Sequence, residues 1–349
     1  GWSSAYGDGQ ASFGTIFAVT DYWTFDGQVR DENNWSDTGA YGFRLSEVVA
    51  NTINHGTGSS HMTFRYVDVG GPASTSYNAG NPDHGFYLGG FGSVLSHWGI
   101  TRSHVHNGNR IPFQLAGASN IVIEYSWIGP NWNKETIRGQ VRASDIVIRY
   151  NVLKNGCQNG PAREGCTADI GMWDGGNGAF DGSQIYGNLI WRTAVDAVSD
   201  GVIFIGGDGG LTAAGSPANN VVVYNNTIVS AAASGNHTIR FPGARTGTVA
   251  SNNIWYLSGG AFAGCTANVC DNNSVYTSSP PFVNPGGGDF RLTGPVAGAT
   301  LGHPYDRDMT GALRGGDGAW DRGAFEFGGA TPPSPTSPSP PTNLRIVNP

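Results

Sequence analysis

Three stretches of the sequence, residues 149–156 (RYNVLKNG), 186–192 (YGNLIWR) and 224–230 (YNNTIVS), decide the fold because they repeat one short pattern. In each stretch an asparagine precedes a leucine or isoleucine by two positions. Further stretches fit the same frame, namely RYVDV, TRSHVH, EYSWIG, ASNNIWY and DNNSVYT. The aligned column contains Val67, Ser103, Ser126, Asn151, Asn188, Asn226, Asn252 and Asn273, at spacings of 21 to 38 residues.

This repeat predicts a solenoid. Short apolar strands at such spacings cannot each bury an inward face alone, whereas stacked coils build one continuous core. An asparagine side chain both donates and accepts, so equivalent asparagines in successive coils can hydrogen-bond along the axis. We therefore predict an all-β protein, a right-handed parallel β-helix with an asparagine ladder, an N-terminal cap and an irregular C-terminal segment.

Composition agrees with this fold and excludes several classes of function. Of 349 residues, 55 are glycine and only 13% are charged, and β-branched residues stand beside turn formers in stretches such as DIVIRY. No stretch approaches the roughly 18 consecutive apolar residues of a membrane span. The formal net charge of −7 argues against a nucleic-acid partner, since phosphate binding requires a basic surface.

A second strand column precedes the ladder column in each coil, with stretches such as FYL, FQL and IFI. Side chains alternate between the two faces of a strand, so the middle residue of each stretch should point outward. Long coils should carry loops, around residues 70–83, 155–168 and 206–218, that wall a binding cleft. The predicted outward row contains Arg44, Tyr87, Gln114, Arg138, Gly171, Phe204 and Arg240.

The organisation along the chain follows from where the repeat ends. Residues 1–329 are predicted to form the β-helix with its caps, and the first forty residues form a strand-rich first turn that protects open sheet edges. The Pro- and Ser-rich residues 330–341 indicate an extended linker. Residues 342–349 resemble the first strand of a truncated fibronectin type III module. From the start at Gly1, without a methionine or a signal segment, we expect a processed or trimmed mature form.

Four cysteines fall into two short-range pairs, Cys157 with Cys166 and Cys265 with Cys270. We expect two local disulfides, because a zinc site would require closer CxxC-type pairs with histidines at matching spacing. Disulfides form outside the reducing cytoplasm, so we expect a secreted protein. We further expect a monomer without a membrane partner.

The same stretches carry a family resemblance. The ladder rows YNNTIV and RYNVLKNG and the closing run DFRL...GHP...DRGAFEF resemble the right-handed parallel β-helix proteins of the pectate-lyase-like superfamily, over roughly residues 15–328. The resemblance implies a secreted bacterial protein with a polysaccharide as its substrate or ligand. The superfamily includes lyases, glycoside hydrolases, epimerases and proteins that only bind, and fold alone does not choose among them.

A lyase that acts on a uronic acid polymer needs a cation beside the sugar carboxylate and a base for the acidic C5 proton. Lys134, Arg138 and Arg142 supply three cations within nine residues, and they are similar in kind to the Lys and Arg pairs of alginate and chondroitin lyases on this fold. Tyr87 and His84 are the candidate proton donors or acceptors. The alternative is a set of solvated or salt-bridged surface charges.

A second set of candidates is acidic. Asp169 is predicted to face outward beside Arg138, with Asp174 just beyond the same strand. The two carboxylates could act as general acid and base on a glycosidic bond, or could hold Ca²⁺ together with Asp208. Apart from Ca²⁺, no cofactor is indicated. The alternative is a surface ion pair between Asp169 and Arg138, with Asp174 in an ordinary turn.

Large aromatic side chains are candidate sugar-binding residues, since an exposed indole can stack on a sugar ring. Trp127, Trp191 and Trp255 are predicted to point outward from ladder strands. Packing under loops is the alternative for all of them. The other substrate-binding candidates are Gln114, Trp132, Trp173, Phe204 and Tyr87.

Two histidines belong to a ladder strand. His104 and His106 alternate outward and could bind a metal ion as a pair, although no third ligand is evident in the sequence. The alternative is a pair of surface histidines without a role.

The sequence as a whole favours an extracellular polysaccharide-degrading enzyme, a lyase that cleaves a uronic-acid-containing glycan by β-elimination. A glycoside hydrolase that uses Asp169 and Asp174 is the second hypothesis. A non-catalytic glycan-binding or adhesion module, which the C-terminal linker also suits, is the third.

Overall fold

The computed structural model describes most of the region predicted to form the β-helix. The predicted linker 330–341 and the module at 342–349 lie outside the described residues, as do Arg142, Asp174, Asp208, Cys157 and Cys166. The described ranges are 10–46, 51–55, 59–71, 84–89, 95–108, 110–132, 134–140, 143–156, 167–173, 180–193, 200–207, 217–233, 235–261 and 263–329.

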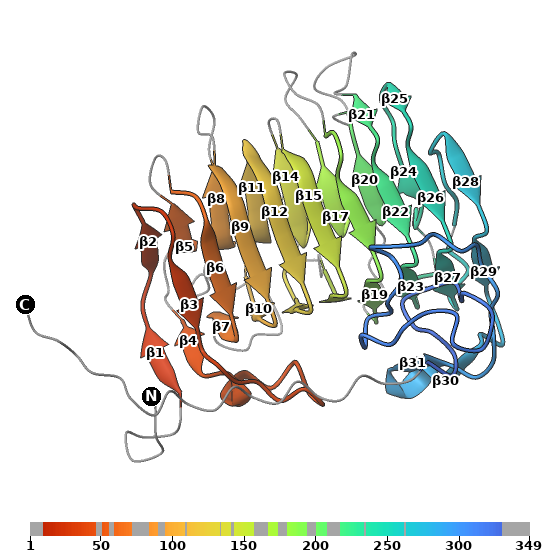
Figure 1. Cartoon of the computed structure of the whole chain (residues 1–349), viewed down its shortest axis with the longest axis horizontal. Coiled ribbons are helices and arrows are strands. Elements are labelled where there is room, and N and C mark those ends of the chain that lie inside the picture. Colours follow the sequence, from red (N-terminus) through yellow and green to blue (C-terminus); the bar gives the residue numbers. More distant parts are fainter. Residues whose placement is uncertain are drawn as a thin grey trace, which may run out of the picture.

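Three sheets of parallel strands extend along the molecule (Figure 1). Sheet A contains β1 (Ala11–Phe13), β4 (Phe43–Leu45), β7 (Val67–Gly70), β10 (His104–His106), β13 (Trp127–Ile128), β16 (Val152–Lys154), β19 (Leu189–Arg192), β23 (Thr227–Ser230), β27 (Ile254–Leu257) and β29 (Ser274–Tyr276). Sheet B contains β2 (Ile16–Ala18), β5 (Asn51–His55), β8 (His84–Gly89), β11 (Ile111–Ala116), β14 (Ile137–Gln140), β17 (Ile170–Met172), β20 (Ile203–Ile205) and β24 (Ile239–Arg240). Sheet C contains β3 (Thr24–Asp26), β6 (Met62–Arg65), β9 (Leu95–Thr101), β12 (Ala118–Glu124), β15 (Ser144–Arg149), β18 (Gln184–Tyr186), β22 (Val222–Tyr224), β26 (Val249–Ser251) and β28 (Val269–Asp271).

The order of the strands defines the fold. The chain passes through sheets C, A and B in turn, as β3, β4 and β5 do, and then enters the next coil with β6. Each strand pairs in parallel with the equivalent strand of the next coil, as β14 does with β17. This arrangement confirms the predicted right-handed parallel β-helix. A short parallel pair, β21 (Ala218–Asn219) with β25 (Arg245–Thr246), extends two coils.

The core is a stack of inward apolar side chains. Along sheet B, Ile137, Ile170 and Ile203 occupy successive coils in one register, and all are fully buried. In earlier coils, Phe86 and Phe113 take the same place with their rings stacked 4.9 Å apart. Each such side chain stabilises the fold by about 1.5–3 kcal/mol through removal of apolar surface from water, so the repeat sums to one continuous core.

Asparagine side chains stack along one inner corner. Asn188 Nδ2 donates to Asn226 Oδ1 at 3.0 Å, and Asn151 Nδ2 donates to Asn188 Oδ1 at 3.1 Å. The row continues through Asn253 and Asn273 with the same bond at 3.0 Å. Each amide also donates to a backbone carbonyl, as Asn188 does to Ile148 O at 2.8 Å. The row satisfies backbone groups at a buried turn.

Two register details of the sequence prediction are wrong. Asn253 rather than Asn252 belongs to the asparagine row, so Trp255 turns inward and is fully buried, with its indole N–H on His237 O at 2.7 Å. Asn252 instead holds the C-terminal segment, through Ala299 O at 2.7 Å. Arg44 belongs to sheet A, because β4 pairs with β7, and Asn54 stands at the corresponding outward position of sheet B.

Asn188→Ala is expected to lower the free energy of unfolding by about 2–3 kcal/mol, because it leaves buried donors and acceptors of two neighbouring coils without partners. Chemical denaturation of the variant and the wild type measures the difference. A matched control is Asn33→Ala, since Asn33 is exposed, lies outside the row and does not have a positive φ. Equal stability of Asn188→Ala and the wild type would contradict a structural role for the row.

The C-terminal segment, residues 277–329, packs on the outer face of the later coils of sheet A (blue in Figure 1). It contains the antiparallel pair β30 (Phe282–Asn284) and β31 (Asp289–Leu292), joined by the 3-10 helix η3 (Pro285–Gly287). Apolar side chains of this segment cover Val152 and later outward residues of sheet A. The buried cluster contains Phe282, Phe290, Leu292, Met309 and Ala324 from the segment and Val152, Leu189, Val229 and Ile254 from the sheet.

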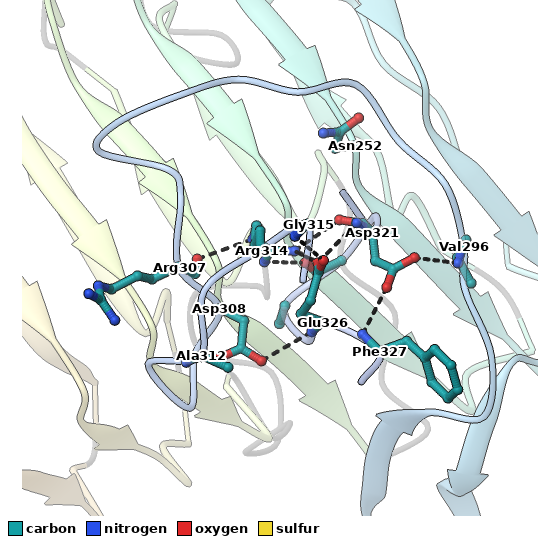
Figure 2. Close-up of polar contacts among 12 residues, drawn as sticks. Asn252, Val296, Arg307, Asp308, Ala312, Arg314, Gly315, Asp321, Glu326 and Phe327 are labelled. Carbon is teal, nitrogen blue, oxygen red and sulfur yellow. Dashed lines mark hydrogen bonds and ion pairs between the residues drawn. The ribbon is translucent and has the colours of Figure 1, made fainter. Parts of the chain in front are cut away.

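A buried polar network holds this segment in shape (Figure 2). Arg314 lies at its centre and pairs with Glu326, with Nη1 and Oε2 3.3 Å apart. Arg314 also donates to the carbonyls of Asp321 and Gly323 at 2.9 and 2.8 Å. Asp308 accepts from the backbone N–H of Glu326 at 3.1 Å. Regular strands are few here, so these side chains satisfy the backbone.

Residues 27–42, which connect β3 to β4 and include the 3-10 helix η2 (Thr38–Ala40), run along the early coils of sheet A (Figure 1). Arg30 donates to the carbonyl of Tyr125, and Glu32 pairs with Arg102 at 2.7 Å. The Tyr41 ring stacks on His104 with centroids 6.0 Å apart. This connection therefore forms a side wall over β7 and β10.

The Cys265–Cys270 disulfide is confirmed, with its partners five positions apart in the sequence. The predicted Cys157–Cys166 pair lies outside the described residues. Within the part of the chain that the structure describes, no helix has the length and apolar character needed to cross a membrane.

Candidate functional site

The outward row of sheet B lies in the predicted register. Tyr87 pairs with Gln114 and Gln114 with Arg138, and Gly171 and Phe204 follow. However, Gln114 is only 4% exposed and Phe204 only 1% exposed, so neither offers a face to a sugar. Arg138 lies 5.6 Å from the ring of Trp173, which is half-buried.

The other basic and aromatic candidates near sheet B are also engaged. Lys134 lies in the turn before β14, where its carbonyl accepts from Asn131 Nδ2 at 2.8 Å. His84 begins β8, with Nδ1 2.8 Å from Asn51 Oδ1, and its ring packs against Tyr87. Trp132 is buried, contrary to its expected role as a sugar platform. A catalytic role for Lys134, Arg138, His84 or Tyr87 stays a prediction.

The expected outward orientation of Asp169 is wrong. Its carboxylate is fully buried and pairs with the buried Arg192, with Oδ1 and Nη1 2.7 Å apart. Asp169 precedes β17, and its side chain is directed to Arg192 of β19 in sheet A rather than to Arg138 of β14. Burial raises the pKa of Asp169, and Arg192 opposes that shift. This position supports neither an acid–base pair with Asp174 nor a solvent-facing Ca²⁺ ligand.

A cavity of about 390 Å³ lies instead on the outer face of sheet A, which is within the rough range of small-ligand pockets, about 300–1,000 Å³. Ser36 and Thr38 of the β3–β4 connection form one side of it. The C-terminal segment covers sheet A from Val152 onward. The early coils of sheet A therefore stay open between this segment and the β3–β4 connection. The outward strand residues that line the cavity are Arg44, His104, His106, Trp127 and Lys154.

Beside this cavity, three ligand-type side chains converge. Asp68 Oδ1 lies 2.9 Å from His106 Nε2 and 3.0 Å from His104 Nδ1. Asp68 is opposite His104 in the β7–β10 pairing, so stacking of two coils joins residues that are 36 positions apart. All three side chains are buried. Arg44 Nε approaches the second oxygen of Asp68, at 3.6 Å.

These contacts fix the charge of the group. Burial alone would raise the pKa of Asp68, but the two imidazoles lower it to about 2. Burial and the neighbouring His106 lower the pKa of His104 to about 4. At neutral pH the group therefore contains a carboxylate and an uncharged His104 ring.

Lys154 lines the same cavity from β16. Burial lowers the pKa of its amine to about 7. Its Nζ lies 2.9 Å from the ring centroid of Trp191, and a ring face favours the charged ammonium. The ring face of Trp191 therefore opposes part of the lowering of the Lys154 pKa by burial. Trp191 is held from behind by Phe290 and Gly288 of the C-terminal segment, where a Cβ on Gly288 would lie 2.6 Å from the indole.

Three residues of this site, Asp68, Arg44 and Lys154, were not among the candidates predicted from the sequence. A signal for Asp68 was present, because the aligned rows RYVDV and TRSHVH place it in the same column as His104. Lys154 stands in a quoted ladder row, three positions after Asn151. Trp127, which was expected to point outward, does line the cavity.

The cavity thus combines the permanently charged guanidinium of Arg44, the Lys154 amine, whose pKa is near neutral pH, and the indole of Trp127. Arg44 can neutralise an acidic group, Lys154 in its neutral form can accept a proton, and Trp127 can pack on an apolar ring face. Among the described residues that line it, there is no carboxylate; Asp68 lies behind the two histidines.

Comparisons with known proteins give one likeness of fold. No protein-family description matches the chain, and no curated protein matches it significantly. Among solved structures, a crystal structure of pectate lyase Pel9A is similar, with 14% sequence identity, 91% of this chain and 86% of that chain covered, and a TM-score of 0.40. So distant a likeness says nothing of activity. The strand pairing itself establishes that this chain is a right-handed parallel β-helix.

Proposed function

We propose that this protein cleaves a uronic-acid-containing polysaccharide by β-elimination at the cavity on sheet A. The observation that carries the proposal is the meeting of Arg44, Lys154 and Trp127 around one cavity. A lyase needs a cation for the sugar carboxylate and a base for the proton on the adjacent carbon, and this set supplies both. We further propose that the protein acts outside the cell, which the Cys265–Cys270 disulfide supports.

The reaction assigns a role to each residue. The Arg44 guanidinium binds the uronate carboxylate and thereby acidifies the C5 proton. Neutral Lys154 removes that proton, the electron pair forms the C4–C5 double bond, and the C4–O bond to the neighbouring sugar breaks. The leaving oxygen takes up a proton, which the Lys154 ammonium can return. Trp127 packs against a sugar ring and keeps it in place.

Hydrolysis is the weaker alternative. A glycosidase usually requires two carboxyl groups on either side of the bond, and the described residues that line the cavity supply none. The acid–base pair predicted from the sequence, Asp169 with Asp174, is not supported, because the Asp169 carboxylate is buried against Arg192.

Incubation with polygalacturonate, alginate and glycosaminoglycans tests the proposal. We expect new reducing ends together with the ultraviolet absorbance of a C4–C5 unsaturated uronate, for at least one of these polymers. Reducing ends without that absorbance would mean hydrolysis. Retention on an immobilised polymer without any product would mean a binding module. Either of the last two results overturns the lyase assignment.

A further inference from the structure

We propose that Asp68, His104 and His106 form a binding site for one divalent transition-metal ion, with Zn²⁺ as the probe, and that its open coordination positions face the sheet A cavity. Each of the three residues offers one ligand atom, and these atoms all lie within 4.8 Å of one another. The inference goes beyond the proposed function, because a metal can bind here whether or not the protein cleaves a glycan.

The separations suit a metal. Asp68 Oδ1 lies 2.9 Å from His106 Nε2 and 3.0 Å from His104 Nδ1. Two ligands about 2.1 Å from one ion lie roughly 3.0 Å apart when they meet at a right angle and roughly 3.4 Å apart at a tetrahedral angle. A shift of a few tenths of an ångström would therefore serve either geometry. Two imidazoles and one carboxylate are a donor set of transition metals, with positions left for water or a ligand.

Hydrogen bonding leaves part of this group unsatisfied. Among the described residues, neither Asp68 Oδ2 nor His104 Nδ1 has a hydrogen-bond partner, although both side chains are more than nine-tenths buried. His104 Nδ1 nevertheless lies 3.0 Å from Asp68 Oδ1, without hydrogen-bond geometry between the two atoms. A cation bound between Nδ1 and the carboxylate would give both atoms a partner.

The surroundings leave room for an ion and orient its ligands. Gly70 pairs with His106, and a Cβ on Gly70 would lie 2.9 Å from His106 Nε2. Asn107 Nδ2 lies 2.8 Å from His106 Nδ1 and 3.4 Å from Gly71 O, so a polar side chain holds the second ring nitrogen of His106. Such a contact to the second ring nitrogen is usual for a metal-bound histidine. His104 and His106 both line the cavity, so a bound ion is open to it.

A site filled with a divalent ion has a net positive charge, because Asp68 contributes one negative charge and Arg44 one positive charge. Ca²⁺ is not expected here, because it prefers six to eight oxygen ligands, and the group offers one carboxylate.

Zinc binding to the purified full chain, stripped with a chelator and without any sugar, tests the inference. We expect one Zn²⁺ per chain by calorimetry and metal analysis, and at least about 100-fold weaker binding in Asp68→Asn and in His106→Gln. His97→Gln is the matched control, because His97 is an exposed histidine stacked 4.5 Å from His61 on sheet C and measures adventitious binding.

If the variants at buried positions do not fold, the thermal midpoint of the wild type still tests the site. One equivalent of Zn²⁺ should raise the thermal midpoint of both the wild type and His97→Gln, while Ca²⁺ should not. Failure of wild-type protein to bind Zn²⁺, or unweakened binding in folded Asp68→Asn and His106→Gln, overturns the site. Because no polysaccharide is present, neither result depends on the lyase proposal.

Discussion

Lys154→Met is expected to lower kcat/KM on the cleaved polyuronate by about 10³-fold, since loss of a positioned base typically costs about 10²–10⁴-fold. Lys154→Arg should be about as inactive, because a guanidinium keeps the positive charge but does not accept a proton at neutral pH. Initial rates of unsaturated product formation measure both effects. Unchanged thermal midpoints would show that the loss is chemical.

If Lys154 is the base, the activity should increase with pH. Lys154 can accept a proton only in its neutral form, which dominates above its pKa. Burial lowers that pKa to about 7, and the face of Trp191 favours the charged form. We therefore expect kcat/KM to rise as the pH passes through about 7 and then to level off. A rise only near the ordinary lysine value of about 10.4 would contradict the assignment.

The chain contains only two lysines, Lys134 and Lys154, so a matched pair of variants separates the two candidate sites. Lys134→Met removes the amine predicted from sequence, beside sheet B. Lys154→Met removes the one that lines the cavity on sheet A. Activity that survives the first change and is lost in the second supports the sheet A site. The opposite result would move the chemistry to sheet B.

Asp169→Asn is expected to lower the free energy of unfolding by about 3–5 kcal/mol, because it leaves the Arg192 guanidinium buried without its counter-charge. The two side chains are fully or almost fully buried and 2.7 Å apart. Arg192 also donates to the carbonyl of Gly156 at 2.7 Å, which fixes it in place. Chemical denaturation measures the loss of stability.

A double variant serves as the control for this prediction. Asp169→Leu combined with Arg192→Met removes both charges and should recover part of the lost stability, since an apolar pair of similar size needs no counter-charge. An Asp169→Asn protein that is fully stable yet inactive would instead restore the catalytic role that the sequence suggested.

Local pattern was sufficient to predict the coils but not every register. The row FRL at residues 43–45 has the same form as FYL and FQL, yet β4 pairs with β7 and so belongs to sheet A. In ASNNIWY, either Asn252 or Asn253 fits an asparagine row, and the choice reverses the side of Trp255. Only the pairing with neighbouring coils decides, because a shift of one residue exchanges the two faces of a strand.

The candidate site was less accessible to sequence reasoning, for two physical reasons. The column that aligns Asp68 with His104 was visible in the sequence, but the contact between their side chains depends on the exact stacking of β7 on β10. The openness of the cavity depends on which coils the C-terminal segment covers, and that segment follows no repeat. Surface charge was visible in the sequence, whereas the burial that changes the pKa of Lys154 was not.

Long-distance crossings change how this molecule can come apart. In a simple solenoid each coil touches only its neighbours, and an end coil can peel away alone. Here Arg30 reaches a carbonyl 95 residues later, Ala324 bonds to Thr227 97 residues earlier, and Tyr305 meets Gln184 across 121 residues. Fraying at either end must therefore break bonds several turns inward, which makes the two ends cooperative with the middle.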